Sequence, residues 1–433
     1  MSEEVAATIT AVWRLESTRL VAGLVRMTRD VGLAEDLAQD ALVAALEQWP
    51  ASGTPASPGA WLMAVAKRRA VDHFRRAETL RRRTAELAHG LEEVTVPDLD
   101  TCVDHIEDDV LRLVFLSCHP ALPPESRAAL TLRLVAGLTT TEIAHGFGVR
   151  DATIGQRISR AKKTLVGVDL AMPQGREREG RLADVLAVVY LIFNEGYAAT
   201  AGQDWTRPEL TLEALRLSRL LAGLVPREPE VHGLQALLEL QESRTRARTG
   251  PAGEPVLLEV QDRCRWDQLL IRRGLAAIDR AKSLGTPGGP YLLQAEIAAC
   301  HARARTAGAT DWDRIAGLYD ILGRLTPSPF VEVNRAVAHG RAHGPDDGLA
   351  VLDALGEEAL AGSHLRPAVR GDLLARAGRS EEASACFRAA AALTRNEGER
   401  AVLLHRAAEL AQETLSKEPV PVRRLGDEPN EPP

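Results

Sequence analysis

The chain has 433 residues and a formal net charge of −7, with 45% hydrophobic and 26% charged residues. This length gives room for about two to four domains and excludes a single minimal module. Only 4% of the residues are aromatic, while Ala, Leu and Arg are abundant, so we predict an all-α fold.

The sequence contains no signal that would direct the chain out of the cell or into a membrane. The start, Met1–Glu4, lacks the basic and apolar regions of a signal peptide, and the longest mostly apolar stretch, 182–193, is too short to span a bilayer. No CxxC pair occurs among the five cysteines, which are Cys102, Cys118, Cys264, Cys300 and Cys386. We therefore predict a cytoplasmic protein with free thiols, no membrane contact, and no metal or other cofactor.

Residues 1–85 are predicted to form a first helical domain. Apolar residues between Ala34 and Trp49 recur at steps of three and four, which is the period of a helix with one buried face. Pro, Gly and Ser then predict a loop over 50–58, and a second helix over 61–83. That helix has a strongly basic side, although the negative total charge hides it: Lys67, Arg68, Arg69, Arg75 and Arg76. Such an arc suits a phosphate backbone, and a merely solvated basic face is the alternative.

An acidic stretch over 86–108 contains no Lys or Arg, and we interpret it as a linker with little regular structure. The next domain, 109–168, carries a predicted helix-turn-helix. Thr139 and Glu142 are spaced as a capping box at the start of its first helix, and Gly148 suits the turn that ends it. The second helix, about 150–165, has an apolar stripe, namely Ile154, Ile158, Ala161 and Leu165. Its opposite face presents side chains that can bond base edges and phosphates: Thr153, Gln156, Arg160 and Lys163.

Two segments together resemble one known family. The segments AEDLAQDALVAALEQWP (34–50) and SPGAWLMAVAKRRAVDHFRR (57–76) are similar to the domain 2 signature of extracytoplasmic-function (ECF) sigma factors of the sigma-70 family. The segment LPPESRAALTLRLVAGLTTTEIAHGFGVRDATIGQRISRAKKTL (122–165) resembles their domain 4, in the order and at the separation typical of the family. One departure is Lys67-Arg68, where many members have Arg-Asn.

The resemblance implies partners and roles for individual residues. The polar face of the first helix would dock on the β′ clamp helices of core RNA polymerase, through Glu35, Asp36, Gln39 and Asp40. The 50–58 loop would capture a flipped base of the −10 promoter element, and Trp61 with the basic arc would hold the adjacent strand. Domain 4 would contact the β flap and read the −35 element. The protein itself would not be an enzyme.

The C-terminal half is predicted to be a helical extension over 181–416, after a short linker over 169–180 and before a disordered tail over 417–433. The blocks 345–352 and 380–387 lie 35 positions apart and have the same character, close to the tetratricopeptide (TPR) period of about 34. Several segments of the extension also resemble an ECF subgroup with a TPR-like C-terminal domain: 190–200, 262–271, 310–320 and 327–338. The resemblance implies a regulatory role and a protein or peptide partner, and a merely stabilising cap is the alternative.

Polar residues of the extension could also suggest a small-molecule pocket: Asn194, Glu195, Tyr197, Trp266, Asp267, Asn334 and Arg335. Packing and buried hydrogen bonds are the favoured interpretation, because no nucleophile with its base, phosphate loop or metal spacing accompanies them. Two other classes of protein remain as alternatives. One is a TPR-containing helix-turn-helix regulator that binds duplex DNA without joining the polymerase, and the other is a scaffold whose repeats alone matter.

Overall fold

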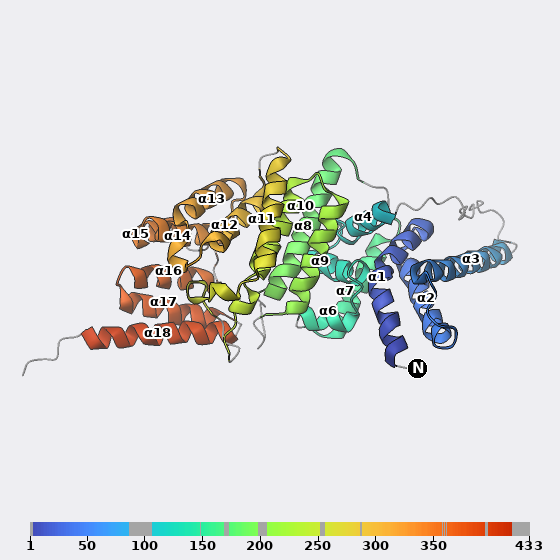
Figure 1. Cartoon of the computed structure of the whole chain (residues 1–433), viewed down its shortest axis with the longest axis horizontal. Coiled ribbons are helices and arrows are strands. Elements are labelled where there is room, and N and C mark those ends of the chain that lie inside the picture. The colour runs from blue at the N-terminus through green and yellow to red at the C-terminus, as the bar shows by residue number, and fades with distance from the viewer. Residues whose placement is uncertain are drawn as a thin grey trace, which may run out of the picture. The chain divides into compact units, whose positions relative to one another are not determined.

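The computed structural model describes residues 3–85, 106–147, 149–168, 173–197, 206–251, 256–285, 288–356, 358, 360, 362–394 and 397–417. These residues form helices and connections without a strand, as the all-α prediction requires (Figure 1). The chain divides into two compact units, of which the first comprises 1–199, 206–242 and 279–286, and the second the remainder. The predicted linker 86–108 and the predicted tail 417–433 lie almost wholly outside the described residues.

The first helical domain, which we call domain 2 after the signature it resembles, contains three helices. Its helices are α1 (Glu3–Thr28), α2 (Val31–Ser52) and α3 (Pro58–Ala85). Asp30 caps α2, because its carboxylate accepts the backbone N–H of Leu33 at 3.0 Å. Most of the apolar stripe of α2 is buried from Ala34 to Trp49, although Leu46 is 38% exposed. This burial confirms the predicted amphipathic helix.

The predicted loop at 50–58 is too long. Helix α2 continues through Pro50 to Ser52, and α3 begins at Pro58, so the connection is only 53–57. Proline removes one backbone bond, which a helix already anchored by its buried stripe tolerates in its last turn, and proline fits the first turn of α3. Gly53, with φ of +79°, makes the sharp exit from α2.

Domain 4 follows as four short helices. They are α4 (Ile106–Ser117), α5 (Pro124–Leu134), α6 (Thr140–Phe147) and α7 (Asp151–Leu165). Helix α7 buries Ile154, Ile158, Ala161 and Leu165 against α5 and α6, which confirms the predicted stripe. Gly148, the predicted end of the first helix, lies outside the described residues.

Three further helices of the first unit follow domain 4. They are α8 (Gly175–Tyr197), α9 (Pro208–Leu224) and α10 (Pro229–Glu242). The predicted linker over 169–180 is therefore wrong from Gly175 onward, where α8 has already begun. Helices α8 and α9 cross closely at Gly196, where a Cβ atom would lie 2.7 Å from the backbone N of Thr211.

The second unit is built from paired helices. Its α-helices are α11 (Gln268–Ser283, which reaches into the first unit's range), α12 (Pro290–Arg303), α13 (Trp312–Leu325), α14 (Pro329–Ala342), α15 (Pro345–Asp353), α16 (Leu365–Arg376), α17 (Ser380–Leu393) and α18 (Glu397–Lys417). Its short 3-10 helices are η1 (Thr245–Ala247), η2 (Leu258–Val260), η3 (Arg263–Arg265) and η4 (Ala307–Ala309). The two predicted TPR-like blocks, 345–352 and 380–387, lie in the helix pairs α14/α15 and α16/α17, and Gly378, with φ of +75°, makes the turn between α16 and α17.

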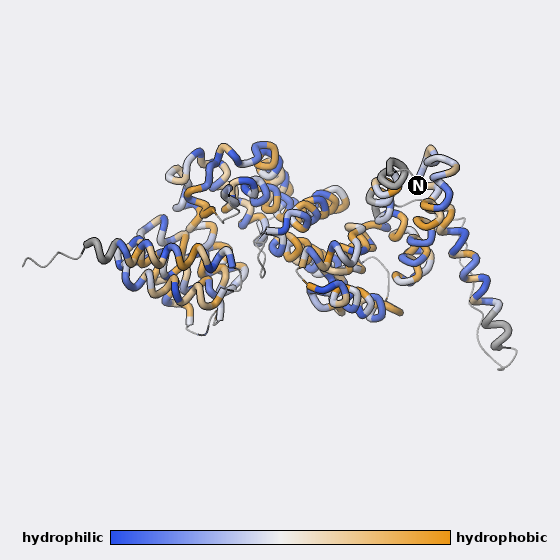
Figure 2. Tube along the Cα trace, turned by 90° about the horizontal axis from the view of Figure 1, so that it is seen from below, coloured by the Kyte–Doolittle hydropathy of each residue, from blue (hydrophilic) through white to orange (hydrophobic). Residues whose placement is uncertain are grey.

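Apolar and polar residues are interspersed along the helices (Figure 2). Within the described ranges, no helix is both long and apolar enough to cross a membrane. The predicted apolar stretch 182–193 lies in α8, where it buries residues from Leu182 to Phe193 against α9.

Gly348→Ala is expected to destabilise the α14/α15 pair by about 1–3 kcal/mol. A Cβ atom at Gly348 would lie 2.6 Å from the carbonyl O of Ala336 and 2.9 Å from Cα of Gly340, and backbone atoms cannot move away cheaply. The matched control is Gly317→Ala in α13, which has open space at that position and should gain about 0.5–1 kcal/mol from better helix propensity. Thermal unfolding followed by circular dichroism measures both, and equal stability of the two variants would contradict the close packing.

Candidate nucleic-acid interface

The polar face of α2 contains four residues predicted to bind polymerase, and their exposure differs. Asp36 and Asp40 are exposed, and Gln39 is half-buried. Glu35 is buried, with a side chain only 7% exposed. The side-chain amide of Gln39 donates to Oε1 of Glu35 at 3.0 Å. The face is therefore polar throughout but open to solvent only in part.

Glu35 is buried by domain 4. Arg133 of α5 donates from Nε to Oε1 of Glu35 at 2.6 Å, and Nζ of Lys162 on α7 lies 2.6 Å from Oε2. Burial alone would raise the pKa of Glu35, but Lys162 and Arg133 outweigh it and hold the pKa below its ordinary value. No local pattern predicts this contact, because Arg133 lies 98 positions from Glu35 along the chain and Lys162 lies farther still.

The basic arc of α3 is largely free. Arg68, Arg75 and Arg76 are exposed, and Lys67 and Arg69 are half-buried. The opposite side buries Leu62, Ala66 and Ala70 in the core of domain 2. Nη1 of Arg69 pairs with Oδ2 of Asp40 on α2 at 3.0 Å, which joins one predicted DNA residue to one predicted polymerase residue.

Trp61 lies in the first turn of α3, next to the 53–57 connection. Its half-buried ring meets the ring of Trp49 edge to face, with centroids 5.4 Å apart and an angle of 65°. Trp49 is fully buried and fixes the orientation of its neighbour. The structure therefore brings the predicted loop and the predicted aromatic residue together.

The helix-turn-helix has the predicted capping box. The backbone N–H of Glu142 donates to Oγ1 of Thr139 at 3.1 Å, and the backbone N–H of Thr139 donates to Oε2 of Glu142 at 2.7 Å. Oγ1 of Thr141 then donates to Oδ2 of Asp151 at 2.6 Å, which ties α6 to the first turn of α7. These bonds fix the start of each helix and hence the face that α7 presents.

The face of α7 opposite its buried stripe is open to solvent. Gln156, Arg160 and Lys163 are exposed, and Thr153 is half-buried. Asp151 stands in the first turn and Lys162 with Lys163 in the last, as the helix dipole favours. The structure brings all four predicted residues onto one helix.

The extension packs on domain 4, which the sequence did not reveal. Arg127 of α5 donates to Asp184 of α8 at 2.8 Å, and Arg181 of α8 donates to the carbonyl O of Phe115 at 2.8 Å. Arg207, just before α9, donates to the carbonyl O of Gly146 in α6 at 3.0 Å. Domain 4 and the first extension helices therefore share one packed unit.

The pair Cys118-His119 has separate, local partners. Sγ of Cys118 lies 3.4 Å from Oγ1 of Thr131 in the core of domain 4, and burial raises its pKa to about 12. Nδ1 of His119 accepts the backbone N–H of Ala121 at 3.2 Å. In the described part of the chain, no cluster of His, Cys, Asp and Glu has the geometry of a metal site.

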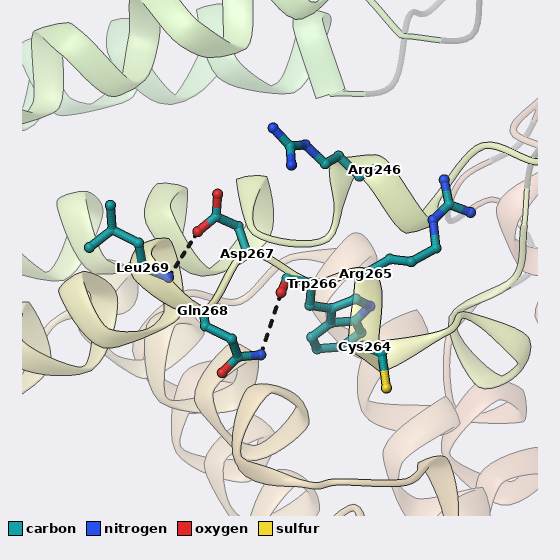
Figure 3. Close-up of a pocket in the computed structure, with 7 residues that line it drawn as sticks. All are labelled: Arg246, Cys264, Arg265, Trp266, Asp267, Gln268 and Leu269. Atoms are coloured by element: carbon teal, nitrogen blue, oxygen red, sulfur yellow. Dashed lines mark hydrogen bonds between the residues drawn. The ribbon is translucent and has the colours of Figure 1, made fainter.

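An open surface hollow of about 700 Å³ lies in the second unit around Trp266 (Figure 3). The ring of Trp266 is 3% exposed and is stacked under the guanidinium of Arg263 at 4.9 Å. Asp267 caps α11, because its Oδ1 accepts the backbone N–H of Leu269 at 2.8 Å. Both residues have structural roles here, as the packing interpretation predicts. The same holds for Arg335, whose Nε donates to Asp320 at 2.7 Å.

Three family models match the chain in order. Sigma-70 region 2 matches residues 14–79, Sigma-70, region 4 matches 112–165, and a family of unknown function (DUF6596) matches 181–282. The first two cover domain 2 and domain 4, and the third covers α8 to α11. The matched order is that of the predicted domains.

Several curated relatives are similar over part or all of the chain. "Uncharacterized protein R00370" of Rhizobium meliloti is 44% identical over 90% of this chain and 93% of its own length. "ECF RNA polymerase sigma factor SigK" of Mycobacterium sp. (strain KMS) is 31% identical over 34% of this chain and 76% of its own. "Probable ECF RNA polymerase sigma factor SigI" of Mycobacterium tuberculosis is 30% identical over 36% of this chain and 54% of its own.

Among solved structures, yeast Tom70 aligns over 96% of this chain and 89% of its own, with a TM-score of 0.37 and 13% identity. The family assignment depends instead on the two sigma-70 regions and on the similarity to SigK and SigI. The chain belongs to the ECF sigma factors of the sigma-70 family, in a form with a long helical C-terminal extension.

Proposed function

We propose that this sigma factor binds core polymerase through the polar face of α2 and directs it to promoters through α3 and α7. Sigma factors are transcription initiation factors rather than enzymes, so catalysis belongs to the polymerase. The observation that carries the proposal is the geometry of α7: its predicted stripe is fully buried, and Gln156, Arg160 and Lys163 are exposed on the opposite side. A helix held in this way can enter a major groove with its polar face toward the bases.

At the −10 element, the 53–57 connection and Trp61 would receive an unstacked base, while Arg68, Arg75 and Arg76 hold the adjacent phosphates. An aromatic face gives a flipped base a new stacking partner and so offsets the cost of unstacking. The guanidinium groups supply the electrostatic part of the affinity. The docking face for the β′ clamp helices would be that of Glu35, Asp36, Gln39 and Asp40, of which Glu35 is covered by domain 4 in this structure. The β flap would bind domain 4.

At the −35 element, Arg160 and Gln156 would read base edges, and Thr153 and Lys163 would hold phosphates. Arginine can donate two hydrogen bonds to guanine, and glutamine can pair with adenine. Lysine acts chiefly as a point charge.

The extension would regulate this activity. In support, α8 and α9 bond directly to domain 4 through Asp184 and Arg207. The TPR-like pairs of the second unit would receive the protein or peptide partner that conveys the signal.

Arg160→Ala is expected to lower promoter-specific run-off transcription by about tenfold or more, with core-polymerase binding unchanged, because it removes a base-reading donor outside the polymerase surface. The matched control is Arg305→Ala, an exposed arginine of the second unit that should have no effect. Equal loss of core binding and transcription in a folded Arg160→Ala chain would refute the assigned role. Duplex binding by the wild type without any core binding would instead favour a TPR-containing helix-turn-helix regulator.

A further inference from the structure

Part of the acidic face of α2 is covered by domain 4, although Asp36 and Asp40 remain exposed. Glu35 would face polymerase by its place on the helix, yet its two carboxylate oxygens are held by Arg133 and Lys162 of domain 4. Lys162 is the neighbour of Lys163 on the helix that would enter the promoter groove. The face of α2 that would bind polymerase therefore packs against α7, the helix that would bind DNA.

Further bonds extend this contact between the two domains. Oγ1 of Thr18 on α1 donates to the carbonyl O of Val135 at the end of α5, at 2.8 Å. Nε of Arg26 on α1 lies 3.0 Å from Oδ2 of Asp109 on α4, and that carboxylate is buried. The contact thus includes three ion pairs and one neutral hydrogen bond, with partners from α4, α5 and α7 of domain 4.

The extension joins the contact at a single atom. The carbonyl O of Val135 also accepts from Nη2 of Arg216 on α9, at 2.9 Å. A carbonyl oxygen has two lone pairs, so one atom of domain 4 bonds to domain 2 through Thr18 and to the extension through Arg216. A shift of α9 would therefore disturb the Val135 carbonyl group, at the boundary between domain 2 and domain 4.

This arrangement cannot exist on a promoter. The −10 and −35 elements are about 25 base pairs apart, which is roughly 85 Å at 3.4 Å per base pair. Domains 2 and 4 must separate to reach both, but the 2.6 Å approach of Lys162 to Glu35 keeps α7 against α2. The pair must therefore break before the two elements can be bound together.

We propose that domain 4, through Arg133 and Lys162, competes with core polymerase for Glu35, and that α9 holds this closed form through Arg216. The inference rests on the proposed function, since it assigns a second, inhibitory partner to the polymerase-binding face. A buried carboxylate that loses its partner is left with an uncompensated charge. Glu35 therefore needs a cationic partner, which would come from domain 4 in the closed form and from polymerase in the open form. A signal that moves α9 would release domain 4 and expose the face.

The test uses full-length Arg133→Gln/Lys162→Gln, which leaves Glu35 and every predicted DNA residue intact. With the closed form less populated, the apparent affinity for core polymerase should rise by about tenfold, because binding no longer has to open the chain. Arg150→Gln, an exposed change at the cap of α7, is the matched control and should leave core affinity unchanged. Arg216→Ala should produce part of the same rise without touching the Glu35 pair.

The opening itself is measured by electron-spin distance between labels placed at the exposed positions Gln48 and Thr164 through unnatural amino acids. A short distance in the wild type that lengthens in the double variant, together with tighter core binding, supports the proposal. An unchanged distance overturns it, and so does a longer distance without tighter binding. Absence of core binding in every variant would overturn the proposed function and the inhibitory role, while the label distances would still decide whether the closed contact exists.

Discussion

Trp61→Ala is expected to reduce promoter opening by between about tenfold and a hundredfold while core-polymerase binding stays at the wild-type level. Stacking of one base on an aromatic ring is worth about 1–3 kcal/mol. The ring of Trp61 is half-buried, is oriented by Trp49, and stands beside the 53–57 connection, where a flipped base would arrive. Permanganate reactivity of unpaired thymines at the −10 element measures the opening directly.

Trp61→Phe is the matched control, because it keeps an aromatic face in the same place. It should retain most of the opening, whereas Trp61→Ala should recover activity only on a template whose −10 region is already unpaired. Full opening by a folded Trp61→Ala chain would contradict the role given to this side chain. Thermal unfolding of each variant checks that loss of the Trp49 contact has not unfolded domain 2.

The second unit should lose roughly 3 kcal/mol of stability between pH 6.5 and pH 4 because of His301 alone. Burial, followed by the nearby charges of Arg244 and Arg263, lowers the pKa of His301 to about 4. Its ring packs edge to face against Trp312 in the neutral form, with centroids 5.2 Å apart. The unfolded chain takes up a proton near pH 6.5 and the folded chain does not, so the stability is complete above that pH and decreases as the pH falls toward 4.

His301→Phe keeps an aromatic ring and removes the titration. Urea unfolding, followed by hydrogen exchange of peptides from α12 and α13, should show a smaller loss of stability in this variant over the same pH range. The comparison concerns the slope with pH, so a constant difference in stability does not affect it. Identical slopes for the wild type and His301→Phe would show that His301 is not the group that titrates.

Local patterns predicted the helices that are amphipathic by themselves. The capping box of Thr139 and Glu142 and the stripe of α7 follow from spacings of a few residues, and the structure confirms them. The blocks 345–352 and 380–387 likewise lie in the helices α15 and α17. Such signals are local because a cap bonds within one turn and a stripe needs only the helical period.

Local patterns do not predict where each helix begins and ends. The loop predicted from Pro50 to Pro58 and the linker predicted to 180 were drawn from breaker residues alone. In the structure, α2 is buried as far as Trp49 and continues through the exposed residues Pro50 to Ser52, and α8 starts at Gly175. The packing of the buried residues of α2 outweighs the cost of one helix-breaking proline in its last turn.

Local sequence patterns predict the helical class, the basic arc of α3 and the residues that α7 presents, because each depends on contacts within one helix or one short motif. The two sigma-70 regions follow from the resemblance of two segments to a known family. The burial of Glu35 by Arg133 and Lys162, and the two hydrogen bonds to the carbonyl O of Val135, are visible only in the folded structure. Those contacts join positions about 80 to 130 residues apart, and no local spacing encodes them. A charged residue on an amphipathic helix has the same pattern whether it faces water or a partner, and only its neighbours in space distinguish the two.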